Sequence, residues 1–240
     1  MHVSTYDIVL PVHNEADTIT ETLEEFRAVA ARHELSVRFI VCEDGSTDRS
    51  VSVIEELRTR LPLELITSPT RKGYSRAAID GLRAAQSEWV GFIDADGQCD
   101  PADFPTLVAA AGEHDLVVGY RSPRHDPWVR LLMSAAFRTV YRSLLNVPLR
   151  DPSSPYLLVR RTALSRLLVG DVGRLKQGFW WEFYARAYAV GLKVLEVPVH
   201  HRHRIGGKTQ VYRPTRVPRI AVEHLVGLWA LRRELRRARS

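Results

Sequence analysis

The sequence predicts an α/β fold in which helices cover both faces of a mostly parallel sheet. Two features of the chain lead to this prediction. Short apolar runs alternate with amphipathic helical patterns over residues 5–120, and three of the apolar runs end at clusters of polar residues, at Asn14, Glu43 and Asp94. Strands that alternate with helices form parallel sheets, and such sheets bind ligands beyond the carboxyl ends of their strands.

The strands expected in the first half of the chain are short and mostly apolar. They occupy residues 6–12, 37–42, 63–66, 89–93 and 116–119. Helices are expected between them, because apolar residues recur there at spacings of three and four, as at Ile19, Leu23 and Phe26. The other helices of this half are expected after Asp48, from Lys72 and from Phe104.

The second half contains fewer and longer segments. We expect a long helix over residues 126–147, a loop and a strand over 151–161, a helix over 179–190 and a strand over 194–199. The last segment, residues 216–237, is an amphipathic helical pattern with a strongly basic end. A basic amphipathic helix is typical of contact with an anionic membrane surface, although a helix packed on the core with a solvated tail also fits.

Composition limits the function classes. Hydrophobic residues make up 45% and charged residues 26% of 240 residues, as in an ordinary soluble globular protein. Cys42 and Cys99 are too few for a four-cysteine zinc site, and we expect no disulfide and a cytosolic location. Neither a signal peptide nor a transmembrane segment is expected. The net charge of +6 favours an anionic partner: nucleic acid, an anionic membrane or a phosphorylated substrate.

Two carboxylates follow the expected strand at residues 89–93. Asp94 and Asp96 stand two residues apart at the edge of the predicted sheet, where they repel each other unless a cation lies between them. A hard divalent ion with oxygen ligands is the usual partner of such a pair, and Mg²⁺ is commonly shared between carboxylates and substrate phosphates. Two solvated turn carboxylates are the alternative.

Three segments in the right order resemble the family 2 glycosyltransferases with a GT-A fold. They are Leu10-Pro11-Val12-His13-Asn14-Glu15, Glu43-Asp44-Gly45-Ser46-Thr47-Asp48 and Asp94-Ala95-Asp96-Gly97-Gln98. A looser set is similar to the polyprenyl-phosphate branch, which includes the dolichol-phosphate sugar synthases: Val118-Gly119-Tyr120-Arg121, Arg130, Ser134, Asp151-Pro152-Ser153-Ser154, Arg160-Arg161 and Arg204-Ile205-Gly206-Gly207-Lys208-Thr209. Where the family usually has two aspartates, this chain has Glu43 and Asp44, so the resemblance assigns no role to Glu43.

The resemblance implies a nucleotide-diphospho-sugar transferase fold and a set of site residues. The residues implied for the nucleotide sugar are Pro11, Asn14, Glu15, Asp44, Lys72, Asp94, Ala95 and Asp96. Mg²⁺ or Mn²⁺ is implied at Asp94 and Asp96, with Gln98 completing the shell. The residues implied for catalysis are Asp96, Arg121, Arg130 and Ser134, and those for the acceptor are Arg121, Arg130, Ser134, Arg202, Arg204 and Lys208. Asn14 and Asp44 also fit as helix caps, and the arginines as solvated surface charges.

The resemblance further implies that the protein transfers a sugar, with inversion, from a nucleotide diphosphate donor such as GDP-mannose or UDP-glucose to a polyprenyl phosphate. A phosphate acceptor is already anionic and needs no protein base. An acceptor hydroxyl would need one, and Asp151 and Glu182 are the candidates, although Glu182 also stands four residues before Arg186, at ion-pair spacing. His200, His201 and His203 alternate along a strand end and so do not share one ion.

We expect one GT-A domain over residues 1–213, with a nucleotide-sugar half at 1–120 and an acceptor half at 121–213, followed by the basic helix at 214–240. The expected location is the cytoplasm, peripherally on the inner face of the cell membrane. A nucleic-acid-binding protein is the remote alternative. The basic residues lack the interleaved aromatic residues of single-strand readers, so no nucleic acid is expected as a partner.

Overall fold

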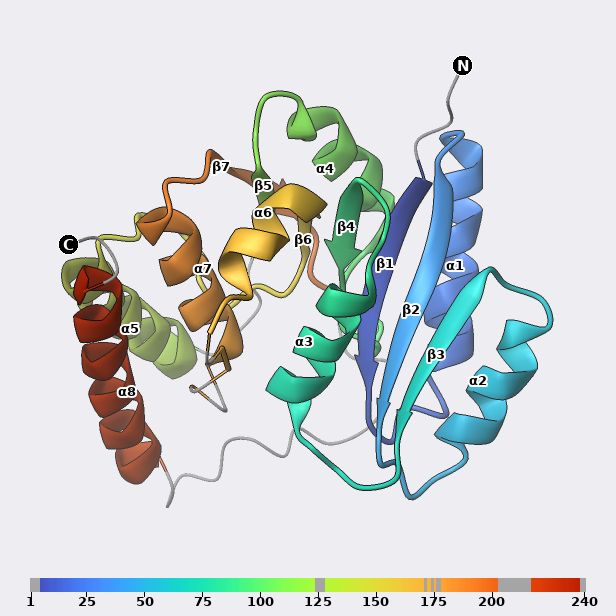
Figure 1. Ribbon diagram of the computed structural model, residues 1–240, viewed down its shortest axis with the longest axis horizontal. Helices are drawn as coiled ribbons and strands as arrows, with labels where there is room; N and C mark the ends of the chain where they lie inside the picture. The colour runs from blue at the N-terminus through green and yellow to red at the C-terminus, as the bar shows by residue number, and fades with distance from the viewer. Residues whose placement is uncertain are drawn as a thin grey trace.

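The computed structural model describes residues 5–123, 128–170, 172–173, 175, 178–202 and 217–237. They form one seven-stranded sheet in the order β3-β2-β1-β4-β6-β5-β7 with helices on both faces (Figure 1). The strands are β1 (Thr5–Val12), β2 (Ser36–Asp44), β3 (Leu63–Ser68), β4 (Trp89–Phe92), β5 (Leu116–Arg121), β6 (Leu157–Arg160) and β7 (Val194–Val199). The predicted fold class is confirmed.

All neighbouring strands run parallel except at β6. This strand lies between β4 and β5 and is antiparallel to both, whereas β1 pairs in parallel with β2 and β4, and β5 with β7. The carboxyl ends of β1, β2, β4, β5 and β7 therefore lie along the same edge of the sheet, which we call the rim. The loops that follow these strands carry most of the predicted site residues.

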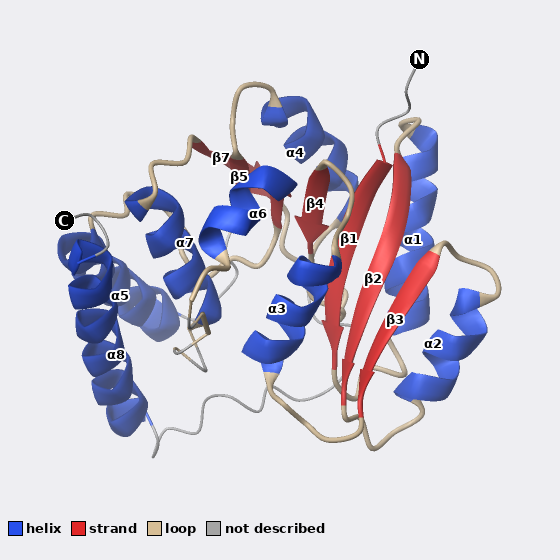
Figure 2. Cartoon of the chain, viewed as in Figure 1, coloured by secondary structure: helices blue, strands red, loops and turns tan. Residues whose placement is uncertain are grey.

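Strand alternation builds two cores from one sheet. Val9 faces one core, and its neighbours Ile8 and Leu10 face the other, as expected for side chains that alternate along a strand. The first core is covered by α3 (Tyr74–Ala84), α6 (Arg161–Leu167) and α7 (Phe179–Ala189), and the second by α1 (Ile19–Arg32), α2 (Ser50–Arg58) and α4 (Phe104–Ala111) (Figure 2). Both faces are therefore sealed, and the rim remains available to a ligand.

Two further helices extend the first core. The long helix α5 (Trp128–Leu145) contributes the buried ring of Tyr141, and α8 (Val217–Arg237) contributes Leu228 and Leu231. Side by side at one end of the molecule, α5 and α8 pack on each other (Figure 1). Within the described residues, no helix is both long and apolar enough to cross a bilayer.

The structure corrects three details of the predicted elements. Strand β2 continues through Glu43 and Asp44, which were expected in a loop, and both side chains are buried. Asn14 does not cap α1, because its φ of 57° is left-handed and α1 begins only at Ile19. Helix α6 was not predicted. It follows β6 directly at Arg161, with no turn residue to mark the boundary.

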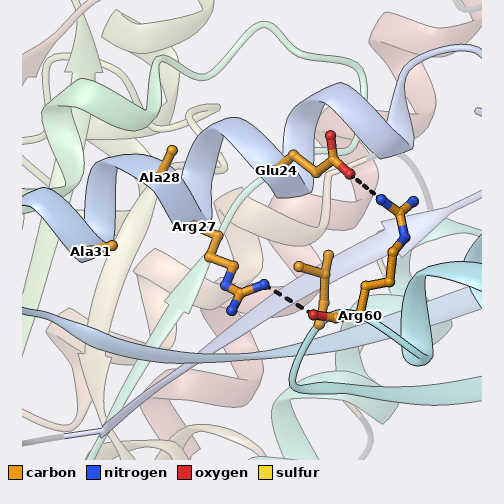
Figure 3. Close-up of a pocket in the computed structure, with 6 residues that line it drawn as sticks. Glu24, Arg27, Ala28, Ala31 and Arg60 are labelled. Atoms are coloured by element: carbon orange, nitrogen blue, oxygen red, sulfur yellow. Dashed lines mark hydrogen bonds and ion pairs between the residues drawn. The ribbon is translucent and has the colours of Figure 1, made fainter.

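A surface hollow lies between α1 and the residues that precede β3. It measures about 410 Å³ and is lined by Glu24, Arg27, Ala28, Ala31, Arg60 and Leu61. Arg60 pairs with Glu24 at 2.8 Å, and Arg27 donates to the carbonyl oxygen of Arg60 at 3.0 Å (Figure 3). Glu24, Arg27 and Arg60 thus all have hydrogen-bond partners within the lining of this hollow.

Candidate active site

Loops after β1 and β2 are tied together at the rim. The Oδ1 atom of Asn14 accepts from the backbone amides of Thr47 at 2.8 Å and Asp48 at 3.3 Å. In the other direction, the amide of Asn14 donates to the Ser46 hydroxyl at 3.0 Å. The amide of Glu15 donates to the Ser50 hydroxyl at 2.9 Å. Asn14 is therefore a bridge between two loops, and it holds Glu15 at a fixed position on the rim.

A threonine connects this pair of loops to the carboxylate loop. The hydroxyl of Thr18 lies 3.0 Å from the carboxylate of Glu15 and 3.0 Å from the carbonyl oxygen of Ala95. Since Thr18 is buried, this contact fixes the 94–98 loop beside Glu15. Pro11, by contrast, is buried within β1 opposite Cys42, so it shapes the strand end from inside the sheet.

Asp94 and Asp96 follow β4 directly, as predicted, and both side chains are half-buried. Burial raises the pKa of Asp94, and the negative charge of Asp96 raises it further. Arg121 and the hydroxyl of Tyr74 oppose this shift, whereas Glu15 adds to it. The structure thus brings Glu15, Asp96 and Arg121 within electrostatic range of Asp94.

The donor set at the rim suits a hard divalent ion. Within the described residues, no three His, Cys, Asp or Glu side chains gather closely enough to hold a metal alone. Mg²⁺ is usually held by one or two carboxylates, with phosphate oxygens and water as its other ligands. Two mutually repelling carboxylates, one with a raised pKa, therefore fit Mg²⁺ or Mn²⁺ bound together with a diphosphate.

Gln98 connects the carboxylate loop to the end of β7. Its amide nitrogen Nε2 lies 3.3 Å from Nε2 of His201 and 3.3 Å from the carbonyl oxygen of Arg202. Its backbone amide donates to Oδ1 of Asp96 at 3.1 Å. Two predicted site residues, Asp96 and Gln98, are thus joined, and His201 is a neighbour that the sequence did not indicate.

His200 and His201 point in different directions, as predicted, and His203 lies outside the described residues. Nδ1 of His200 lies 2.9 Å from Oδ1 of Asp103, whereas His201 faces Gln98. Arg202, expected at the acceptor, extends its guanidinium to Glu25 at 2.7 Å and Asp100 at 2.6 Å. Two carboxylates therefore already balance the charge of Arg202.

Asp44 and Lys72 shape the loop before α3. The two carboxylate oxygens of Asp44 accept from the backbone amides of Lys72 at 2.6 Å and Gly73 at 2.8 Å. A side chain at Gly45 would place its Cβ 2.6 Å from the Arg71 nitrogen, so glycine is required where these loops cross. The ammonium of Lys72 pairs with Asp80 of α3. Asp44 thus clamps the 71–73 loop, because its carboxylate accepts two backbone hydrogen bonds from that loop.

Arg121, at the end of β5, forms a bidentate ion pair with Asp151. Nε of Arg121 lies 2.6 Å from Oδ2 of Asp151, and Nη2 lies 2.9 Å from Oδ1. Nη2 also donates to the Ser153 hydroxyl at 2.8 Å. Because Asp151 is buried and committed to this pair, it orients Arg121 and is poorly suited to accept a proton from a substrate.

Glu182, the other carboxylate considered as a base, is fully buried in α7. It accepts from Nε of Arg186 at 3.0 Å and from the amides of Gly173 at 3.2 Å and Leu175 at 3.3 Å. The ion-pair alternative for Glu182 is confirmed. Neither candidate base is therefore presented to a substrate hydroxyl.

The structure describes only part of the other predicted acceptor residues. Arg204 and Lys208 lie outside the described residues. Arg130 lies in α5, but its side chain is outside the described part of the chain. Ser134, also in α5, is half-buried. Their assignment remains a prediction.

Sequence reasoning missed an aromatic chain behind Asp94. Nε1 of Trp180 donates to the hydroxyl of Tyr74 at 2.9 Å, and that hydroxyl donates to Oδ1 of Asp94 at 2.8 Å. Trp180 also packs edge-on against Phe92, with ring centroids 4.5 Å apart. A sequence signal existed only for Trp180, in the unusually aromatic run Phe179-Trp180-Trp181.

Both cysteine thiols have raised pKa values. Burial raises the pKa of Cys42 to about 12 and also raises that of Cys99, where Asp94 adds to the shift. Both thiols therefore stay protonated near neutral pH, and neither is a nucleophile or a ready metal ligand.

Comparisons with known proteins identify the family of this chain. The model of the family "Glycosyl transferase family 2" matches residues 7–168. The chain is a member of glycosyl transferase family 2. An uncharacterised glycosyltransferase of Mycobacterium tuberculosis is 35% identical over 212 residues, which cover 85% of this chain and 88% of the relative. The glycosyltransferase described here therefore matches most of the length of a relative whose name specifies no substrate.

More distant relatives have more specific names. The undecaprenyl-phosphate 4-deoxy-4-formamido-L-arabinose transferase of Edwardsiella ictaluri is 26% identical over 208 residues, covering 85% of the glycosyltransferase described here and 62% of that relative. Among solved structures, glucosyl-3-phosphoglycerate synthase of M. tuberculosis, in complex with Mn²⁺ and UDP, matches with a TM-score of 0.68 at 21% identity, covering 95% and 80% of the two chains. A mannosyltransferase of Pyrobaculum calidifontis, in complex with GDP-Man and Mn²⁺, matches with a TM-score of 0.65 at 21% identity. The match covers 94% of this chain and 63% of the mannosyltransferase. These structures establish the fold.

Proposed function

We propose that this glycosyltransferase moves a sugar from a nucleoside diphosphate donor to a polyprenyl phosphate, with inversion, using Mg²⁺ or Mn²⁺. The observation that supports this most directly is the Arg121–Asp151 pair. It holds a guanidinium near Asp94, while both candidate bases are locked in buried ion pairs. A fixed arginine, with Asp151 and Glu182 both held in ion pairs, suits an acceptor that is already an anion.

On the donor side, Asp94 and Asp96 would hold the metal ion. The ion would neutralise the charge that develops on the departing nucleoside diphosphate. Asn14, Glu15 and the loop that Asp44 clamps would frame the nucleoside, because they surround the same stretch of the rim. GDP-mannose and UDP-glucose are the donors we propose to test first.

On the acceptor side, Arg121 would bind the phosphate and orient its oxygen toward the anomeric carbon. The cationic guanidinium attracts phosphate, and positioning of two reactants supplies much of the rate enhancement of a direct displacement. Asp151 accepts from Nε and Nη2 of Arg121 and would keep the guanidinium in a fixed position. The residues of the acceptor half, 121–213, thus include both partners of the pair that supports the proposal.

The proposed acceptor is a membrane lipid, so the enzyme would work peripherally at the cytoplasmic face of the cell membrane. The 26% identical relative, an undecaprenyl-phosphate sugar transferase by name, supports this choice of acceptor class. An acceptor hydroxyl is the competing chemistry, and it would require a base that neither Asp151 nor Glu182 provides in its present contacts.

The test is transfer of radiolabel from GDP-mannose and UDP-glucose, with Mn²⁺, to undecaprenyl phosphate in detergent. Parallel reactions replace the lipid with 3-phosphoglycerate or with an oligosaccharide. We expect a labelled lipid product that disappears with a chelator and with Arg121→Ala. Label on a lipid-free acceptor, with no lipid product from either donor, would contradict the proposal.

A further inference from the structure

Helix α8 is attached to the body of the protein by one face only. Leu228 and Leu231 are buried against the first core, and a Cβ at Gly227 would come within 2.3 Å of Leu175, so the helix packs closely. Oε1 of Glu234 lies 2.9 Å from Nη2 of Arg186 on α7. These contacts fix which face of α8 points outward.

The outward face combines apolar and basic side chains in one stripe. Val226 and Trp229 are 63% and 53% exposed, and Arg233 and Arg236 are exposed as well. The steps of three, four and three residues between them follow one side of a helix. The Arg233 guanidinium lies over the Trp229 ring, 4.8 Å from its centroid. A shallow cavity of about 410 Å³ is lined by Trp229, Arg232, Arg233 and Arg236.

We infer that this stripe, Val226, Trp229, Arg232, Arg233 and Arg236, binds the phosphate headgroups of an anionic membrane. Arginine forks match phosphate oxygens, and tryptophan favours the boundary between headgroups and acyl chains. An acidic protein or nucleic acid would match the arginines but not the exposed valine and tryptophan beside them. The reason for such binding rests on the proposed function, because a polyprenyl acceptor lies in the bilayer.

Charge nearby supports the same partner. Arg138 and Arg142 are exposed on α5, which packs beside α8 (Figure 1). The acidic residue within the stripe's own turn, Glu234, is engaged with Arg186. The end of the molecule formed by α5 and α8 therefore presents a basic surface.

The experiment is co-sedimentation with vesicles of phosphatidylcholine, with and without phosphatidylglycerol. The test variant is R232Q/R233Q/R236Q, which keeps good helix formers. The matched control, R32Q/R49Q/R58Q, removes three arginines from the α1 and α2 end of the molecule. We expect the wild type and the control to bind only the anionic vesicles. The test variant should bind about 100-fold more weakly, since each arginine contributes about 1 kcal/mol at such a surface.

The result is independent of whether the proposed reaction is correct. Vesicle binding without a lipid product would contradict the proposed function and support the docking surface. A lipid product without vesicle binding would support the function and contradict the docking surface. Circular dichroism and a thermal shift with UDP and Mn²⁺ should be unchanged in the test variant. Equal binding by the test variant and the wild type would overturn the inference. So would full competition by soluble glycerol phosphate, or equally tight binding to DNA.

A separate observation assigns a role to Tyr74. Indole N–H is a donor only, so Trp180 must donate to the Tyr74 oxygen, and the single proton of Tyr74 is then directed to Asp94. Trp180 is held by its contact with Phe92 of β4. We propose that Tyr74 is a positioning residue, which fixes the Asp94 carboxylate in the orientation that binds the metal.

Mn²⁺ affinity, measured by calorimetry in the presence of UDP, tests this role without any turnover. Tyr74→Phe should weaken Mn²⁺ binding by about 10-fold or more, as is typical when a partner behind a metal ligand is removed. Tyr120→Phe is the matched control, because the Tyr120 hydroxyl contacts Arg150 and not the carboxylate loop. Equal affinity in Tyr74→Phe and the wild type, or no Mn²⁺ binding by the wild type, would overturn the proposal.

Discussion

Asp94 is the residue whose environment departs most from that of a free carboxylate. Burial and the neighbouring charge of Asp96 raise its pKa in the folded protein. The folded state therefore binds this proton more tightly than the unfolded chain. It follows that the metal-free protein loses stability as the pH rises from the ordinary carboxyl range through the raised pKa.

Asp94→Asn should consequently raise the melting temperature of the metal-free protein at pH 7.5, although it removes a proposed ligand. The amide oxygen can still accept from Tyr74, and the repulsion with Asp96 is gone. Differential scanning calorimetry in the presence of a chelator measures the effect, which should shrink at pH 4. A lower melting temperature for the variant at pH 7.5 would show that no repulsion is relieved.

Asp151 provides a second prediction for a single residue. Asp151→Asn leaves the Arg121 guanidinium without its buried partner, and loss of one member of a buried ion pair costs about 3 kcal/mol. Urea denaturation should show this loss. The folded variant should keep the shape of the wild-type pH–rate profile, whereas loss of the acidic limb of that profile would identify Asp151 as a base.

The residues found from sequence are those with a local signal. Asp94 and Asp96 stand together after an apolar run, so their position at the rim could be predicted. The partners of Asp94 could not, because Tyr74 and Trp180 lie 106 residues apart and meet only through the packing of α3 and α7. Asp151 was a candidate base for the same reason. Its pairing with Arg121 depends on the three-dimensional geometry of the rim, and the sequence around neither residue indicates it.

At the scale of elements, the strands of the first half were predictable because their apolar runs are bounded by polar residues. The region around β6 was not. Strand β6 passes into α6 between Arg160 and Arg161, with no glycine or proline to separate them. Its antiparallel direction is likewise a property of the whole sheet, set by its place between β4 and β5.

Arg186 forms two ion pairs, one with Glu182 within α7 and one with Glu234 of α8, and their difference in burial predicts unequal effects. Glu182 is fully buried and accepts from Arg186 and two backbone amides, whereas the Glu234 side chain is 32% exposed. Glu182→Gln should cost about 3 kcal/mol and Glu234→Gln about 0.5 kcal/mol. Chemical denaturation of both variants checks this, and equal losses would mean that the two carboxylates are equally solvated.

At the scale of the whole molecule, charge is divided between two regions. The rim gathers Glu15, Asp94 and Asp96, and the end formed by α5 and α8 presents arginines. An acidic rim repels a diphosphate unless a cation accompanies it, so metal and nucleotide binding should be coupled. The basic end, by our inference, faces the membrane that holds the acceptor.

The central claim is that the carboxylates of Asp94 and Asp96 bind a divalent ion together with the donor's diphosphate. A thermal-shift measurement with UDP or GDP, with and without Mn²⁺, tests it most directly, with Asp96→Asn as the comparison. We predict that the wild type gains about 5–10 °C at saturating ligand only when metal and nucleotide are both present. The variant should gain almost nothing. A nucleotide shift that needs no metal, or an equal shift in Asp96→Asn, would contradict the claim.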